Sequence, residues 1–170
     1  SATRAASTPS VGDLVEDFRL SPMNAAHSGR LSHYQGKQPE SHVVLVTFFA
    51  TWCGPCRIEL PQMQTLADAY ANHGLRVLAV SIDREGGLVT RPFADQIGLH
   101  LPILHDQDGR LANHYHIRGV PQTVAIGHDG RIRAIYVGAV NWDEPVLHAQ
   151  LVAWLEEAAV ANKSGLPSKT

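Results

Sequence analysis

The hydrophobic positions of this chain alternate between runs typical of buried strands and spacings typical of helices. Residues 43–50 and 75–82 are apolar on both faces, which predicts two strands covered by other elements on each side. Between them, apolar side chains in residues 55–72 recur at helical spacing, so this segment is predicted to be a helix. Pro61 lies inside this helix and is expected to kink it, and Gly74 is expected to end it.

The second half of the chain continues the alternation in shorter pieces. The predicted elements are a helix at 88–97 closed by Gly98, a strand at 102–104, a helix at 110–116, strands at 123–126 and 132–137 joined by a hairpin at 128–131, and a helix at 144–160. Alternating strands and helices followed by a hairpin and a last helix indicate an α/β fold, with a central mixed β-sheet flanked by helices.

The chain is predicted to form a single domain between two flexible ends. We expect residues 1–10 to be a flexible tail, residues 11–161 to form the domain and residues 162–170 to be a second flexible tail. Residues 21–40 are polar and contain glycine and proline, which predicts a loop with one short strand near 30–32.

Composition and charge narrow the possible partners. A chain of 170 residues with 44% hydrophobic residues suits one domain with a sizeable core. The formal net charge of −2 gives no argument for a nucleic acid or an acidic membrane as partner, and we expect neither. No segment is long enough to cross a bilayer, so we expect no membrane insertion. We also expect the protein to be a monomer. The N-terminal sequence SATRAASTPS suits a tail left by signal cleavage, a linker from a removed anchor, or a cloning scar.

The candidate chemistry lies where the first buried run meets the first helix. The only two cysteines, Cys53 and Cys56, flank Gly54 and Pro55 in a Cys-Gly-Pro-Cys motif at the predicted helix start. Unpaired N–H groups and the helix dipole favour a thiolate there, and Pro55 suits a first turn in which a missing N–H costs nothing. Lowering a thiol pKa from about 8.5 to about 7 represents roughly 2 kcal/mol, which a helix terminus can supply. The motif therefore predicts a redox-active pair.

Other uses of the two cysteines fit less well. Structural zinc needs four ligands, and the nearest histidines, His114 and His116, have a surface character. A purely structural disulfide would close so small a loop that it removes little entropy from the unfolded chain. Covalent haem attachment needs a histidine directly after the second cysteine, where Arg57 stands. No metal site and no cofactor are expected.

Two alternatives from other functional classes stay open. The first is a copper-binding or copper-delivery module in which both cysteines and one of His105, His114 or His116 hold Cu(I), which prefers soft thiolates. The second is a peroxidase, but that chemistry uses a lone cysteine in a Thr-x-x-Cys setting, and Ala50 occupies the threonine position.

The WCGPC motif, Pro61 five residues beyond its second cysteine, and the later GVPQT before a hairpin and terminal helix are similar to the thioredoxin superfamily. Over roughly residues 11–160 the chain resembles its TlpA/DsbE-like (ResA-like) branch of exported thiol–disulfide oxidoreductases. The resemblance implies a thioredoxin-like fold with an N-terminal extension and a central insertion. It also implies a periplasmic or otherwise extracytoplasmic location.

We expect Cys53 to be the nucleophile, because it is nearer the helix start, and Cys56 to be the resolving thiol, one turn further in. Thioredoxin has a buried aspartate at the position of Thr47, so that proton acceptor is absent here. The TlpA-like branch has a glutamate three residues after the second cysteine, and Glu59 occupies that place. Glu59 is thus the candidate base for Cys56, against the alternative of a solvated glutamate near a helix start.

The resemblance also implies that the Val120–Pro121 bond is cis and lies against the disulfide, where Val120 backbone groups can pair with a bound peptide. Spacing alone would favour an ordinary trans proline at the start of a strand. Trp52 is expected to pack beside the sulfurs and shape the substrate surface with Gly54 and Pro55, the alternative being a core tryptophan.

The expected activity is reduction of disulfides in exported proteins, including a possible role in cytochrome c maturation, with electrons supplied by another dithiol protein. The Gly-Pro interior matches thioredoxin, which is a reductant, so we expect a potential on the order of −200 to −270 mV.

Overall fold

The computed structural model describes residues 8–164, so most of the predicted N-terminal tail lies outside the described residues. Its elements are β1 (Ser21–Pro22), α1 (Leu31–Gln35), β2 (Val43–Phe49), α2 (Gly54–Tyr70), the 3₁₀ helix η1 (Ala71–His73), β3 (Leu75–Ser81), α3 (Gly87–Ile97), β4 (Ile103–His105), α4 (Arg110–His114), β5 (Gln122–Ile126), β6 (Ile132–Val137) and α5 (Pro145–Ser164). Apart from β1 and α1, these elements correspond to the segments predicted above.

The strands form one mixed sheet in the order β1-β4-β3-β2-β5-β6. β2 is parallel to β3 and β3 to β4, whereas β5 is antiparallel to β2, β6 to β5, and β1 to β4. In the middle of the sheet, Val46 of β2 pairs with Leu78 of β3 on one side and with Val124 of β5 on the other. β2 is therefore an interior strand, as its apolar sequence predicts.

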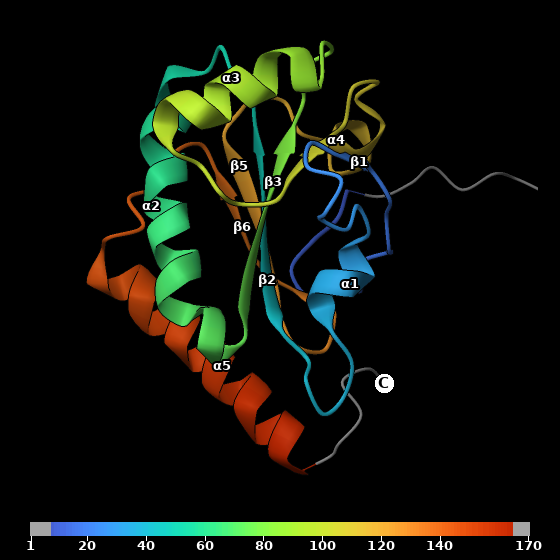
Figure 1. The fold of residues 1–170 in the computed structure, drawn as a ribbon. Helices are drawn as coiled ribbons and strands as arrows, with labels where there is room; N and C mark the ends of the chain where they lie inside the picture. The colour runs from blue at the N-terminus through green and yellow to red at the C-terminus, as the bar shows by residue number, and fades with distance from the viewer. Residues whose placement is uncertain (1–7, 165–170) are drawn as a thin grey trace, which may run out of the picture.

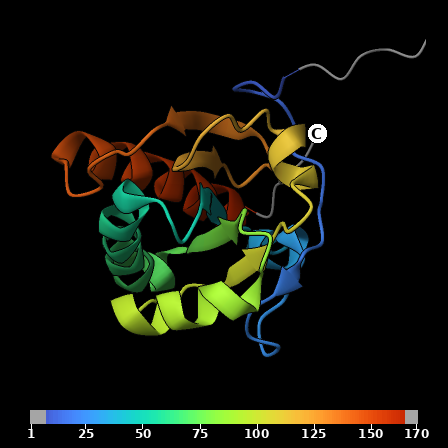
Figure 2. The same ribbon diagram turned by 90° about the horizontal axis from the view of Figure 1, so that it is seen from above.

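Helices cover both faces of the sheet, which accounts for the lack of polar alternation in β2. α2, α3 and α5 lie on one face and α1 and α4 on the other (Figure 1), and Figure 2 shows this arrangement of layers from above. Along β2, Val43, Leu45 and Phe49 belong to the core under α2, while Val44 and Phe48 belong to the core on the opposite face. Each face of the strand thus needs apolar side chains.

The predicted short strand near residues 30–32 is wrong. Arg30 has an extended backbone and forms an isolated bridge with Arg19, but helix α1 begins at Leu31. Asp17 stabilises this helix start, because its carboxylate accepts hydrogen bonds from the Ser32 N–H at 2.8 Å and the Ser32 hydroxyl at 2.9 Å. The cap comes from a residue well before the helix, so local sequence does not reveal it.

The predicted boundary of the C-terminal tail is also wrong, because α5 continues to Ser164. The Asn162 side chain accepts a hydrogen bond from the Ser41 N–H at 3.0 Å and donates one to the Ser41 carbonyl at 2.9 Å. These two bonds attach the end of α5 to the segment before β2. The rest of the predicted tail, residues 165–170, lies outside the described residues. Within residues 8–164, no helix combines the length and the hydropathy needed to cross a membrane.

Candidate active site

Cys53 and Cys56 lie where β2 ends and α2 begins, and a disulfide joins them with their Cα atoms 5.3 Å apart. Cys53 is the N-cap residue of α2, and its Sγ accepts the N–H of Cys56 at 3.2 Å. Cys53 is 5% exposed and Cys56 is fully buried. Of the two sulfurs, Cys53 is the more accessible and the one that the helix start can stabilise as a thiolate.

Gly54 and Pro55 form the first turn of α2, as the motif predicts. The missing N–H of Pro55 costs nothing there. A Cβ added at Gly54 would meet no atom of the described residues within 4 Å, so the surface is open at this position.

The segment before β5 lies against the disulfide. The Val120–Pro121 peptide bond is cis, as the resemblance implied. The Val120 carbonyl oxygen lies 3.7 Å from Cys53 Sγ. Within residues 8–164, neither the N–H nor the carbonyl of Val120 has a backbone hydrogen-bond partner, whereas the Pro121 carbonyl accepts from the Gly138 N–H at 3.0 Å. Val120 therefore has both backbone groups available next to the reactive sulfur.

Trp52 is 72% exposed, so its alternative role as a core residue is wrong. It lines a pocket of about 470 Å³ together with Val120. Ile82 and Ile117 add further apolar wall, and Arg84 lies among the polar lining residues. A partner that reached Cys53 would meet this pocket at the same time.

Glu59 is only 3% exposed, which rules out the alternative of a solvated glutamate. It lies one turn beyond Cys56 in α2, and its Oε1 accepts the indole N–H of Trp142 at 2.8 Å. The Val140 backbone also favours the ionised carboxylate, but its geometry falls short of a regular hydrogen bond, and Oε2 has no hydrogen-bond partner in the described part of the chain. Burial outweighs both donors and raises the pKa of Glu59 above its ordinary value.

Thr47 is buried and accepts the hydroxyl of Thr123 at 2.9 Å. It carries no ionisable group, so Glu59 is the acidic side chain nearest in sequence to Cys56.

Arg57 does not turn toward the sulfurs. Its guanidinium lies 4.9 Å from the centre of the Phe93 ring and donates to Gln96 at 3.0 Å, both in α3.

Sequence reasoning missed two residues of this region, Trp142 and Asp83. Trp142 is buried before α5, far along the chain from Glu59. A buried indole N–H needs an acceptor, but that rule does not say which one. Asp83 is buried directly after β3, and its carboxylate accepts hydrogen bonds from Thr51, two residues before Cys53.

The histidines considered as copper ligands do not gather around the sulfurs. His105 is buried, and its Nε2 lies 2.8 Å from the Thr90 hydroxyl. His114 belongs to α4, and His116 follows it. Across residues 8–164, no group of three or more histidine, cysteine, aspartate or glutamate side chains is placed to hold a metal ion.

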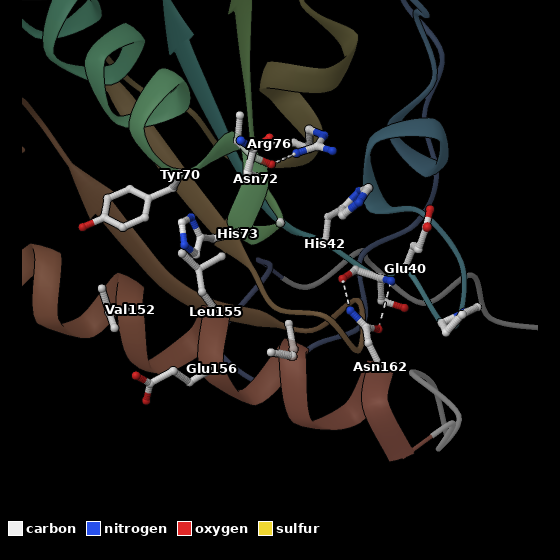
Figure 3. Close-up of a pocket in the computed structure, with 16 residues that line it drawn as sticks. Glu40, His42, Tyr70, Asn72, His73, Arg76, Val152, Leu155, Glu156 and Asn162 are labelled. Atoms are coloured by element: carbon white, nitrogen blue, oxygen red, sulfur yellow. Dashed lines mark hydrogen bonds between the residues drawn. The ribbon is translucent and has the colours of Figure 1, made fainter.

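A separate pocket lies away from this chemistry. It measures about 640 Å³ and lies between η1, α5 and the segment that leads into β2 (Figure 3). His42 and His73 in its lining precede β2 and β3, whereas the cysteines follow the end of β2. The pocket is therefore at the opposite end of the sheet from the disulfide.

A mixed sheet between helices, with a dithiol motif at the start of α2 and a cis-proline against it, defines a thiol–disulfide oxidoreductase of thioredoxin-like fold. The model of the AhpC/TSA family matches residues 11–135. ResA of Geobacillus kaustophilus, a thiol–disulfide oxidoreductase, is 32% identical over 142 residues, which cover 84% of this chain and 78% of that protein. ResA of Oceanobacillus iheyensis is 36% identical over 136 residues, covering 78% of this chain and 68% of its own.

Solved structures agree with these matches. A putative thiol:disulfide interchange protein DsbE from Chlorobium tepidum superposes with a TM-score of 0.77 at 29% identity, covering 87% of this chain and 99% of that one. StoA of Bacillus subtilis has the same fold, with a TM-score of 0.63 at 23% identity, covering 82% of this chain and 96% of its own. The chain belongs to the AhpC/TSA family and, within it, to the ResA/DsbE-like thiol–disulfide oxidoreductases. It is a thiol–disulfide oxidoreductase that acts on protein thiols.

Proposed function

We propose that this protein reduces disulfides of proteins outside the cytoplasm through a dithiol in which Cys53 attacks and Cys56 resolves. The observation that carries the assignment is the asymmetry of the pair. Cys53 Sγ lies at the N-terminus of α2 beside the Val120 carbonyl, whereas Cys56 is completely buried. Only the first sulfur is placed to meet a substrate.

The reaction proceeds in two exchanges. The Cys53 thiolate attacks one sulfur of the substrate disulfide, forming a mixed disulfide and releasing the other substrate sulfur as a thiolate, which takes up a proton. The Cys56 thiolate then attacks Cys53 Sγ, closing the disulfide seen in the structure and releasing the second substrate thiol. Two electrons pass to the substrate, and a separate dithiol protein returns the pair to its reduced form.

Glu59 is the proposed base for the second exchange. Cys56 is buried, so its proton needs an acceptor inside the protein. Glu59 has one carboxylate oxygen held by Trp142, while the other has no partner among residues 8–164. Its raised pKa brings the carboxylate closer to the range in which it can accept a proton from a thiol at neutral pH.

The proposed docking surface consists of Trp52, the open position at Gly54 and Pro55, and Val120. Val120 offers a backbone N–H and a carbonyl, the groups that an extended peptide pairs with when it adds to a strand. Trp52 offers an exposed apolar surface beside it. Pro121 has no N–H, and its backbone carbonyl is fixed by Gly138. It therefore keeps Val120 in place.

The direction of electron flow and the location are also proposals. The Gly-Pro interior supports a reductant, with a potential on the order of −200 to −270 mV. Resemblance to exported relatives supports an extracytoplasmic location and leaves apocytochrome c among the candidate substrates. A monomeric enzyme remains part of this proposal.

Trapping with Cys56→Ser in the native host tests this function. The variant should accumulate disulfide-linked partners through Cys53, and Cys53→Ser should accumulate none. The purified protein should reduce insulin with a dithiol donor present. Tight stoichiometric Cu(I) binding without insulin reduction would support the copper alternative instead.

A further inference from the structure

Asp83 is a buried carboxylate beside the redox motif that the mechanism above does not use. It is 3% exposed and follows β3 by two residues. Its Oδ1 accepts the Thr51 hydroxyl at 2.8 Å, and its Oδ2 lies 3.1 Å from the Thr51 N and accepts the Ser81 hydroxyl at 2.7 Å. Thr51 is two residues before Cys53, so the carboxylate connects the end of one strand to the loop that carries the nucleophile.

No cation neutralises this carboxylate directly. Within residues 8–164, no lysine, arginine or histidine forms an ion pair with Asp83. Burying a carboxylate is unfavourable unless its oxygens accept hydrogen bonds, and here they come from Thr51 and Ser81 alone. The buried carboxylate of Asp83 is therefore stabilised by hydrogen bonds from two segments of the chain, the loop at Thr51 and the end of β3 at Ser81.

One of the two segments is rigid. Ser81 is fully buried and pairs with Phe49 of β2 and with His105 of β4. Its hydroxyl accepts the Asp83 N–H at 3.0 Å and donates to the Asp83 carboxylate, so the aspartate is fixed to the sheet from both its backbone and its side chain.

The other segment is the loop at residues 50–52, which is anchored at its start because Ala50 is fully buried in the core under α2. Residues 50–52 connect β2 to Cys53, and the N–H of Cys53 donates to the Ala50 carbonyl at 3.1 Å. Trp52 is mostly exposed, so packing does not fix it. Between the buried Ala50 and Cys53, Thr51 is therefore the residue that bonds this loop to Asp83, just beyond the end of β3.

We propose that Asp83 is a positioning residue that holds Cys53 within reach of Cys56 by clamping Thr51 to the end of β3. The inference rests on the proposed function of the pair. Holding two reacting groups in place raises their effective concentration, which favours both the closed disulfide and the attack of Cys56 on a mixed disulfide. Loss of the clamp weakens the disulfide relative to the two thiols and slows resolution.

The test uses Asp83→Asn and Thr51→Val, with Thr51→Ser as the conservative variant that keeps the hydroxyl donor. Asp106→Asn is the matched control, because Asp106 is also a fully buried carboxylate but accepts the N–H groups of Leu111 and Ala112 at α4. For each protein, the equilibrium constant of the disulfide against reduced and oxidised glutathione is measured, together with its melting temperature.

Asp83→Asn and Thr51→Val should lower the equilibrium constant about three- to tenfold, which makes the potential about 14 to 30 mV more positive. Thr51→Ser should match the wild type. Asp106→Asn should lower the melting temperature and leave the equilibrium constant unchanged.

The inference is overturned if Thr51→Val leaves the equilibrium constant unchanged, or if Asp106→Asn shifts it as much as the clamp variants do. If Asp83→Asn does not fold, the comparison of Thr51→Val with Thr51→Ser tests the inference. If the wild type itself forms no reversible Cys53–Cys56 disulfide with glutathione, the proposed function fails. That result differs from the failure of the clamp alone, in which the wild type behaves as expected.

Discussion

The indole N–H of Trp142 donates a 2.8 Å hydrogen bond to Oε1 of Glu59, a residue 83 positions earlier in the chain. Both side chains are buried, and Trp142 also packs edge-on against Tyr136 of β6. The carboxylate that is proposed to serve Cys56 is thus held by the loop before α5, and this contact connects the last third of the chain to the redox motif.

Replacing the proposed base should slow resolution of the mixed disulfide. Glu59→Gln keeps the shape of the side chain but cannot accept a proton, so we expect a loss on the order of 10²-fold at pH 7. The measurement is the rate at which a preformed mixed disulfide at Cys53 releases its substrate thiol, with Glu156→Gln in α5 as control. Equal rates for the wild type and Glu59→Gln across pH 5 to 9 would exclude the base role.

Removing the Trp142 donor should move the pH dependence of the same step. The Trp142 hydrogen bond favours the ionised carboxylate and opposes the effect of burial, so Trp142→Phe should raise the pKa of Glu59 further. The pH–rate profile for resolution should shift to higher pH. Trp154→Phe, at a partly buried tryptophan of α5, is the control and should leave the profile in place. A shift to lower pH in Trp142→Phe would contradict the assignment.

The raised pKa of Glu59 also predicts how stability depends on pH. A carboxyl whose pKa is higher in the folded state binds more protons when folded, so its contribution is greatest below the ordinary value of 4.5. That contribution is lost as the pH rises from 4.5 through the folded pKa. Relative to Glu59→Gln, the wild type should lose free energy of unfolding over this interval. Urea titrations at pH 4 to 8 check this, and a difference that stays constant would contradict it.

Trp52 should matter for substrate binding and not for folding. Because its side chain is mostly exposed, Trp52→Ala should change the free energy of unfolding by less than about 0.5 kcal/mol. The same variant should raise the KM for a protein disulfide several-fold, because it removes an apolar contact surface beside Cys53. Val160→Ala, at an exposed position in α5, should change neither quantity. An unchanged KM in Trp52→Ala would remove the residue from the docking surface.

The end of α5 should contribute to stability through Asn162. Asn162→Ala removes both hydrogen bonds to the Ser41 backbone and should lower the free energy of unfolding by about 1 to 2 kcal/mol. Asn72→Ala, at an exposed position in η1, should have little effect. Urea unfolding of the three proteins provides the measurement, and equal midpoints for the wild type and Asn162→Ala would show that the end of the helix is not anchored.

Local patterns predicted most of the fold because the signals that make them are local. The uniformly apolar run at 43–50 requires a strand covered on both faces, and the structure covers it. The proline and cysteines at 53–56 predicted the start of α2 for the same reason. The strand predicted near Arg30 was wrong because Asp17, far from it in sequence, caps a helix there.

The site was predictable only where its residues are close in sequence or follow a family motif. Cys53, Cys56 and Glu59 lie within two turns of one helix, and the resemblance identified Pro121. The partners of these residues come from distant segments. Nothing in the sequence near Trp142 indicates that its N–H reaches Glu59, and nothing near position 83 indicates a bond to Thr51. Such contacts are set by the packing of the sheet and its covering helices.

The most direct test of the account is competitive alkylation of the reduced protein with limiting iodoacetamide at pH 7, followed by mass spectrometry of the two cysteine positions. We expect Cys53 to react at least about tenfold faster than Cys56, and several-fold faster than glutathione under the same conditions, because it is the accessible sulfur at the helix start. Equal labelling of both cysteines, or a Cys53 as slow as glutathione, would contradict the assignment of Cys53 as an activated nucleophile.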